Sequence, residues 1–204
     1  MTDAPLGLRE RKKQQTRDAL HLAAVDLVEQ RGLGAVTTDE IAERAEVSAR
    51  TFFNYFPTKE AAVVGLDEHH ASASAAALAA RPLDEPPAAS VRAVLVERAL
   101  KVTGDQTLWA RRVALARRHP ELTHAMTAWS AGAERALAAA LAERLGVDAA
   151  DPRPALLVAV TGTVVRTSLI NSRQKGSRPA AAIEEGFALL DSISEWSQEI
   201  RRGS

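Results

Sequence analysis

Apolar residues recur along the first part of the chain with the spacing of an amphipathic helix. Within residues 10–30 they stand at positions i, i+4, i+7 and i+8: Leu20, Ala24, Leu27 and Val28. This spacing places them on one face of a helix, because an α-helix turns once every ~3.6 residues. Gly32 is suited to end the helix, since glycine adopts the backbone conformation of a helix C-terminus at low cost. The pattern therefore predicts a helix over residues 10–30.

Two short helices and a longer one are predicted next, each introduced by a hydroxyl residue. Thr38, Ser48 and Thr58 can each accept a hydrogen bond from a free backbone N–H group at a helix start, and so cap that helix. The apolar stripe after Thr38 spans about two helical turns. The segment after Ser48 covers residues 49–56 and is stopped by a proline. The helix after Thr58 is expected to run over residues 59–80, through Ala-rich sequence.

The rest of the chain also follows a helical pattern. Beyond a proline-rich loop, further helices are expected over residues 88–103, 105–118, 121–145, 154–172 and 179–201. Alternating strand patterns and Asn-Gly turn signals are absent from the sequence. The sequence therefore predicts an all-α fold with two domains, a three-helix domain over residues 1–58 and a larger helical domain over residues 59–204.

The predicted short helices have the plan of a helix-turn-helix. In that motif two helices are joined by a tight turn, and the second helix can enter the major groove of DNA. Many small three-helix domains share this arrangement, so the pattern by itself leaves two readings open. The chain is either a DNA-binding regulator or a helical ligand-binding or enzymatic protein whose N-terminal helices serve only as structure.

Composition narrows the class of protein but does not choose between these readings. The formal net charge is zero, and residues 1–60 hold nine Lys and Arg against ten Asp and Glu. Only the local crowding of basic residues at 9–17 therefore favours binding to a polyanionic partner. The chain has no cysteine, which excludes disulfides, thiolate zinc sites and cysteine nucleophiles. No export signal is expected at the start of the chain. No membrane span is expected either, because Arg166 interrupts the longest apolar run. We expect a cytoplasmic protein with no metal, no cofactor and no catalytic activity.

The residues from Thr38 to Val63 carry a resemblance to a known family. The sequence DEIAERAEVSARTFFNYFPTKEAAV combines an Ile-Ala pair, a Val-Ser turn, an aromatic-rich helix and a Lys-Glu start to the next helix. In these features it resembles the TetR family of transcriptional regulators, and the RTFFNYF form resembles an actinobacterial subgroup. The resemblance implies a homodimer, most often a repressor, that binds a palindromic DNA operator and is released by a small ligand in the larger domain.

The resemblance also implies which residues face DNA. Phe52 and Phe56 are four residues apart and are expected to pack inward, behind the recognition helix. Arg50 is expected to contact a guanine base or a phosphate, and Lys59 a phosphate. The basic stretch that holds Lys13 is either an arm that contacts DNA or a solvated tail. The residues expected at DNA are Lys13, Thr38, Ser48, Ala49, Arg50, Thr51, Phe53, Asn54, Tyr55 and Lys59.

In the larger domain, one apolar stripe is expected to form the dimer interface, because the last two helices of each subunit pair in the resembled family. This stripe is Val158, Gly162, Val165 and Leu169. The large side chains Trp109, Met126 and Trp129 either line a ligand pocket or belong to the core. Arg166, expected to be buried, either pairs with an acid across the interface or meets an anionic head group.

The neighbouring arginines and the sequence around them bear on the ligand. Arg111, Arg112, Arg117 and Arg118 are expected to form a solvated face. Residues 108–145 resemble regulators of this family with an acyl-CoA-type ligand domain, in which the same arginines meet phosphates. The expected effector is a small apolar molecule such as an acyl-CoA or a fatty acid.

Overall fold

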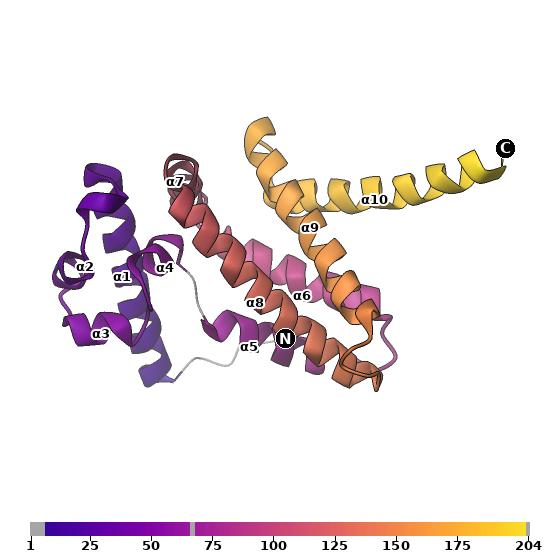
Figure 1. Ribbon diagram of the computed structural model, residues 1–204, viewed down its shortest axis with the longest axis horizontal. Helices are drawn as coiled ribbons and strands as arrows, with labels where there is room; N and C mark the ends of the chain where they lie inside the picture. Colours follow the sequence, from indigo (N-terminus) through magenta and orange to yellow (C-terminus); the bar gives the residue numbers. More distant parts are fainter. Residues whose placement is uncertain (1–6, 66–67, 203–204) are drawn as a thin grey trace. The chain divides into compact units, whose positions relative to one another are not determined.

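The computed structural model describes residues 7–65 and 68–202 of the chain, and these residues form helices and loops without any strand (Figure 1). The predicted all-α fold is confirmed. The helices are α1 (Leu8–Arg31), η1 (Leu33–Ala35), α2 (Thr38–Arg44), α3 (Ala49–Phe53), α4 (Lys59–Val64), α5 (Glu68–Ala79), α6 (Pro87–Val102), α7 (Gln106–Arg118), α8 (Pro120–Leu145), α9 (Pro152–Lys175) and α10 (Pro179–Arg202). The last five helices begin and end within three residues of the predicted bounds.

The described chain divides into two compact units that do not follow the predicted boundary at residue 58. Unit 1 combines the chain up to Glu68 with Thr107–Ser130, and unit 2 combines His69–Gln106 with the chain from Ala131. Helix α4, α7 and the first half of α8 therefore belong with the helix-turn-helix. The physical reason is burial, because the side chains of α4 from Ala61 to Val64 and those of Leu115 and Leu122 lie in one hydrophobic core with α1.

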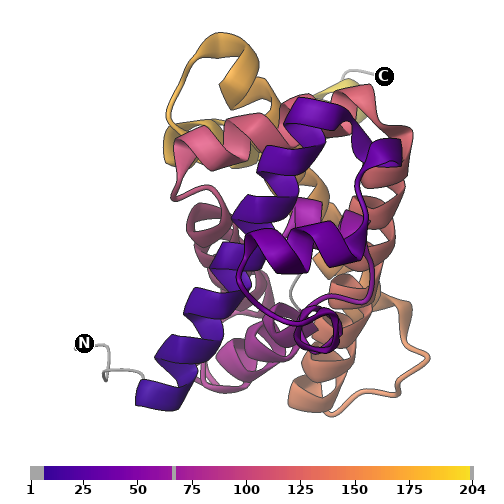
Figure 2. The same cartoon turned by 90° about the vertical axis from the view of Figure 1, so that its left-hand side faces the viewer.

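In unit 1, α1 packs against α2 and α4, and α2 packs against α3 (Figures 1 and 2). The predicted apolar face of α1 is buried. Ser48 and Thr58 cap α3 and α4 as predicted, since their side chains accept hydrogen bonds from Thr51 N and Ala61 N at 3.1 Å. Thr38 is not a cap. Thr37 caps α2 instead, and its backbone N–H donates back to the Glu40 carboxylate at 2.8 Å.

The predicted helix over residues 59–80 is interrupted. Helix α4 ends at Val64, and Gly65 has a φ of 67°, the left-handed conformation that glycine adopts most easily. A Cβ atom at this position would also lie 3.0 Å from Cε1 of His21. Both constraints require glycine, so the chain leaves the helix here although the Ala-rich sequence beyond has high helix propensity.

In unit 2, α9 and α10 pack along each other, and α6 packs against both. Gly186 permits the close approach of α10 to α9, because a Cβ atom there would overlap the hydroxyl of Ser168. Contrary to the sequence expectation, residues Pro152–Ser172 of α9 are long and apolar enough to cross a membrane. The core helix of a soluble protein passes the same test, and the burial of Val158 and Val165 inside unit 2 accounts for part of this apolarity.

Candidate nucleic-acid interface

The turn between α2 and α3 fixes the direction of α3. Glu46 has a φ of 56°, and among the described residues it is the one non-glycine with a positive φ. The turn is closed by backbone hydrogen bonds from Val47 N to Ala42 O at 2.9 Å and from Glu46 N to Glu43 O at 3.0 Å. Ser48 then caps α3. These bonds hold the start of α3 in a defined position relative to α2.

The inner face of α3 and the turn after it are anchored by two phenylalanines. Phe52 and Phe56 have no exposed surface, and their ring centroids lie 6.1 Å apart. Their predicted inward packing is confirmed. Helix α3 ends at Phe53, three residues before the predicted end, so Asn54 and Tyr55 lie in the following turn.

Arg17 of α1 positions this turn, a role that the sequence analysis missed. Its guanidinium carbon lies 4.4 Å from the centroid of the Phe56 ring, and its Nη1 donates to Tyr55 O at 3.3 Å. The arginine is almost fully buried. The sequence held a signal for it, because Arg17 stands three and seven residues before Leu20 and Ala24, on the apolar face of α1.

The opposite side of α3 is open to solvent. Arg50, Phe53 and Asn54 are exposed, and 56% of the Phe53 surface is accessible. Ala49, Thr51 and Tyr55 are half-buried, and Tyr55 packs against the core. Together with Ser48, which caps α3, the structure thus gathers seven of the predicted DNA-facing residues around this helix.

The other predicted contacts have additional or different roles. The ammonium of Lys59 donates to Leu33 O at 2.8 Å and to Val36 O at 2.9 Å, so it ties the start of α4 to the segment between α1 and α2. Two of its three N–H bonds are therefore used within the protomer. Lys13 lies within α1, so the basic stretch is neither a free arm nor a tail but part of a helix. Thr38 is the first residue of α2.

Acidic residues of α1 are paired with α7. The Nε of Arg111 donates to Glu29 Oε2 at 2.9 Å, and its Nη2 donates to Asp26 Oδ1. These bonds to Glu29 and Asp26 raise the pKa of Arg111. Arg112 is largely buried beside Trp109, and burial lowers the pKa of Arg112 to about 10. The predicted solvated face is therefore wrong for these two arginines, whereas Arg117 and Arg118 are exposed.

The predicted ligand-binding residues are divided between the units. Trp109, Met126 and Trp129 belong to unit 1, where Met126 packs against the core. Arg166 belongs to unit 2 and is not buried, since 46% of its side chain is exposed. It does pair with an acid, but the partner is Glu134 of the same chain.

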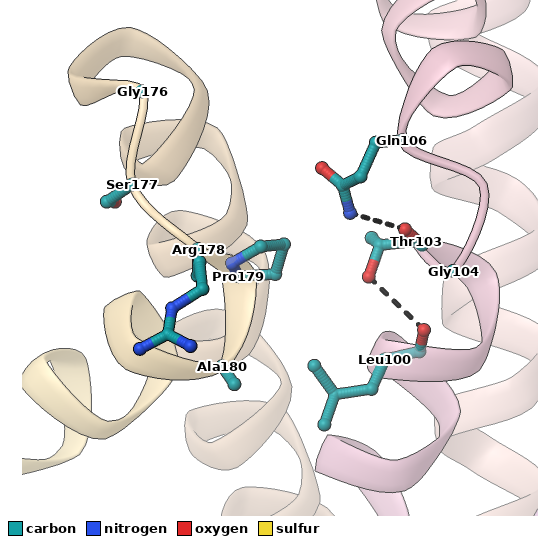
Figure 3. A pocket seen from close by; sticks show the side chains of 9 residues that line it. All are labelled: Leu100, Thr103, Gly104, Gln106, Gly176, Ser177, Arg178, Pro179 and Ala180. Atoms are coloured by element: carbon teal, nitrogen blue, oxygen red, sulfur yellow. Dashed lines mark hydrogen bonds between the residues drawn. The ribbon is translucent and has the colours of Figure 1, made fainter.

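A cavity of about 470 Å³ in unit 2 involves none of the predicted ligand residues. It lies between the end of α6 and the loop that leads into α10 (Figure 3). Leu100, Thr103 and Gln106 line one side, and residues 176–180, including Arg178, line the other. Gln106 Nε2 donates to Thr103 O at 2.5 Å. No periodicity in the sequence marks this cavity, because two loops form it.

The predicted dimer stripe faces the inside of its own chain. Val158, Gly162, Val165 and Leu169 are all buried within the protomer, so they leave almost no surface for a partner. The exposed apolar residues of α9 lie on other faces of the helix: Leu156, Val160 and Ile170. The sequence analysis expected this face of α9 to be open to a partner, whereas α10 and α6 pack against α9 within the protomer and the stripe is buried.

Comparison with known proteins agrees with this architecture. Residues 22–63 match the family described as bacterial regulatory proteins, tetR family, and residues 85–193 match the MftR C-terminal domain. HTH-type transcriptional regulator TcmR of Streptomyces glaucescens is 37% identical over 167 residues, covering 78% of this chain and 74% of the relative. This relative is compatible with the expected actinobacterial subgroup.

Two solved structures share the fold. The SmeT–triclosan complex superposes with a TM-score of 0.53 at 17% identity, covering 85% of this chain and 90% of that chain. The reduced form of Escherichia coli NemR superposes with a TM-score of 0.50 at 20% identity, covering 87% and 97%. The two family matches, the identity with the Streptomyces regulator and the helix-turn-helix described above show that the chain belongs to the TetR family of bacterial transcriptional regulators.

Proposed function

We propose that the chain is a homodimeric repressor that binds a palindromic operator through α3 and leaves it when a small apolar effector binds. The observation that carries this proposal is α3 itself, with a fully buried inner face and an outer face that exposes Arg50, Phe53 and Asn54. The inner contacts hold the helix, and the outer side chains are exposed and so accessible to DNA. We place this activity in the cytoplasm, where bacterial operators are found.

The exposed side chains suit the major groove. The guanidinium fork of Arg50 matches O6 and N7 of guanine, and an asparagine amide such as that of Asn54 matches N6 and N7 of adenine. Phe53 and Ala49 are suited to apolar contact with a thymine methyl group. Ser48, Thr51 and Tyr55 are suited to the sugar-phosphate backbone, together with Lys13, Thr38 and the remaining N–H of Lys59.

Dimerisation is proposed to use the exposed side of α9. Leu156, Val160 and Ile170 are 61%, 47% and 56% exposed, and Leu189 of α10 is also exposed. Exposed apolar residues on adjoining helices favour contact with another protein surface. A dimer is required because a palindromic site offers two half-sites about 34–36 Å apart.

The effector is proposed to be an acyl-CoA, a fatty acid or another small apolar molecule, with Trp109, Met126 and Trp129 as candidate contacts in unit 1 and Arg166 as a separate candidate in unit 2. Half-buried tryptophan and methionine side chains support an apolar ligand. The exposed, paired state of Arg166 supports a role at the margin of a site rather than in its interior.

The proposal is tested with purified protein and DNA from upstream of its own gene. Wild type is expected to protect a palindromic sequence, with affinity that falls steeply as salt rises. Arg50→Ala is expected to lower operator affinity by a factor that corresponds to about 1–3 kcal/mol and to relax the sequence preference. Arg117→Ala, an exposed arginine of α7, is the matched control. Failure of wild type to bind any duplex would favour a helical ligand-binding protein that does not act on DNA.

A further inference from the structure

The turn between α1 and α2 is held by two cationic side chains that bind its backbone carbonyl groups. The ammonium of Lys59, the first residue of α4, donates to Leu33 O at 2.8 Å and to Val36 O at 2.9 Å. From the end of α1, Nη2 of Arg31 donates to Ala35 O at 2.8 Å. Two cations from different helices therefore bind three carbonyls of one short turn. We call Lys59 and Arg31 together the carbonyl clasp.

The two bonds of Lys59 reach into the interior of unit 1. Leu33 and Val36 are 4% and 1% exposed, and Lys59 is itself half-buried. The backbone that carries the lysine is fixed, because Thr58 caps α4 and the side chains of Ala61–Val64 lie in the core. Hydrogen bonds from a charged donor in partly buried surroundings are stronger than exposed neutral ones. Lys59 therefore anchors the turn to the core of unit 1.

The turn held by the clasp leads directly into α2. Val36 has an extended backbone, and the next residue, Thr37, is the N-cap of α2. Nη1 of Arg31 donates to Glu40 Oε1 at 2.8 Å, and the same carboxylate accepts a hydrogen bond from Thr37 N at 2.8 Å. The clasp is thus bonded to the turn and to the first turn of α2. Since α2 packs against α3, the position of α3 depends on where α2 begins.

We propose that Lys59 is a positioning residue for operator binding: with Arg31 it holds the α1–α2 turn, so that α2 and α3 meet DNA in one fixed arrangement. This inference rests on the proposed function, since it assigns a role within DNA binding. A phosphate contact through the remaining N–H of Lys59 is compatible with this role but has a different signature. Such a contact strengthens binding to every duplex alike, whereas a fixed arrangement of two helices favours the duplex whose base edges match them.

The test on DNA measures the affinity of full-length Lys59→Met for the palindromic operator and for a random duplex. Operator affinity is expected to fall about tenfold more than affinity for random DNA, the effect of about one hydrogen bond to a charged group. Lys101→Met, at an exposed position of α6, is the matched control and should leave both affinities unchanged. Equal losses on the two duplexes would overturn the positioning role and leave Lys59 as a phosphate contact.

Arg31→Met tests whether the two cations act through the same turn. The loss of operator affinity in the double variant should be smaller than the product of the two single losses, because the second substitution then acts on a turn already released. A loss equal to the product would show independent effects and contradict the clasp. The Arg31 side chain is 43% exposed, so its substitution is expected to preserve the fold. Its own preferential loss of operator affinity tests the clasp if Lys59→Met does not fold.

Hydrogen exchange of the free protein observes the clasp without DNA. The amides of Glu40 and Ile41 donate to Thr37 Oγ1 and Thr37 O at the start of α2, at 3.3 and 3.2 Å. They are expected to exchange faster in Lys59→Met, while the amide of Phe56, bonded within the turn after α3, keeps its wild-type rate. Unchanged exchange at the start of α2 would overturn the inference and leave the repressor proposal standing. Wild type that binds no duplex would instead overturn the repressor proposal, and with it the positioning role, while leaving the exchange difference in place.

Discussion

At the scale of single residues, Arg17 connects the long first helix to the turn after α3. We predict that Arg17→Met, which keeps the apolar stem, lowers the free energy of unfolding by about 1–2 kcal/mol through loss of the cation–π contact and one hydrogen bond. Operator affinity should fall further than affinity for random DNA, because the turn after α3 loses its anchor. Chemical unfolding and filter binding measure the two effects. Arg11→Met, at an exposed position of α1, is the control, and equal losses in both variants would contradict the positioning role.

His21 should make stability depend on pH. The unfolded chain binds a proton at this residue below about pH 6.5, whereas the folded chain stays neutral until about pH 4. Protonation therefore favours the unfolded chain, and the free energy of unfolding should fall as the pH drops between these values, by about 3 kcal/mol in total. Urea unfolding between pH 7 and pH 4.5 measures the slope.

The pH window separates His21 from the acidic groups. The pKa of Glu40 is lowered to about 2 by its bonds to the Thr37 backbone and to Arg31, and that of Asp151 to about 2 by its bonds to Arg153. These carboxylates are stabilising above their unfolded pKa values, so their effect is lost only below about pH 4.5. His21→Phe should have a flatter profile above pH 4.5. A slope unchanged from wild type would assign the effect to another group.

At the scale of elements, the break at Gly65 is the clearest departure from the helical pattern. Gly65→Ala should destabilise the protein by at least about 1–2 kcal/mol, the cost of the left-handed conformation for a residue with a Cβ atom. The clash with the His21 ring adds to this cost. Gly34→Ala is the matched control, since nothing lies within 4 Å of its Cβ position and its φ is not in the left-handed region. Thermal unfolding of both variants tests the difference, and similar midpoints would show that the break tolerates a side chain.

The helices were predictable because each carries its own periodicity, and the aromatic pair four residues apart was enough to assign the inner face of α3. Contacts between distant segments were not predictable. The Lys59 ammonium binds carbonyls 23 and 26 residues away. Helix α7 joins unit 1 although α5 and α6 separate it from α4 in the sequence. Likewise, two faces of α9 are apolar, and only the packing of α10 and α6 decides which one is covered.

At the scale of the whole molecule, substitutions on the two faces of α9 are expected to have opposite effects on fold and assembly. Leu156→Glu should leave the fold intact and convert a dimer to a monomer, with loss of operator binding, because it places a charge on the exposed apolar side. Val165→Glu should unfold unit 2, because an unpaired charge would be buried. Light scattering and circular dichroism distinguish the outcomes. A dimeric Leu156→Glu protein would exclude this face from the interface.

The composition of unit 1 limits how freely this regulator can be recombined. Its DNA-binding core is completed by Leu115 and Leu122, which come from a segment beginning at Thr107, after a stretch of chain that belongs to unit 2. A fragment ending near Glu68 would lack that cover and expose apolar surface of α1 and α4 to water. Chimaeras that exchange the helix-turn-helix between regulators therefore have to carry α7 and the start of α8 with it. For the same reason, substitutions in α1 and α7 are expected to be inherited as matched sets, with Arg111 retained where Asp26 and Glu29 are retained.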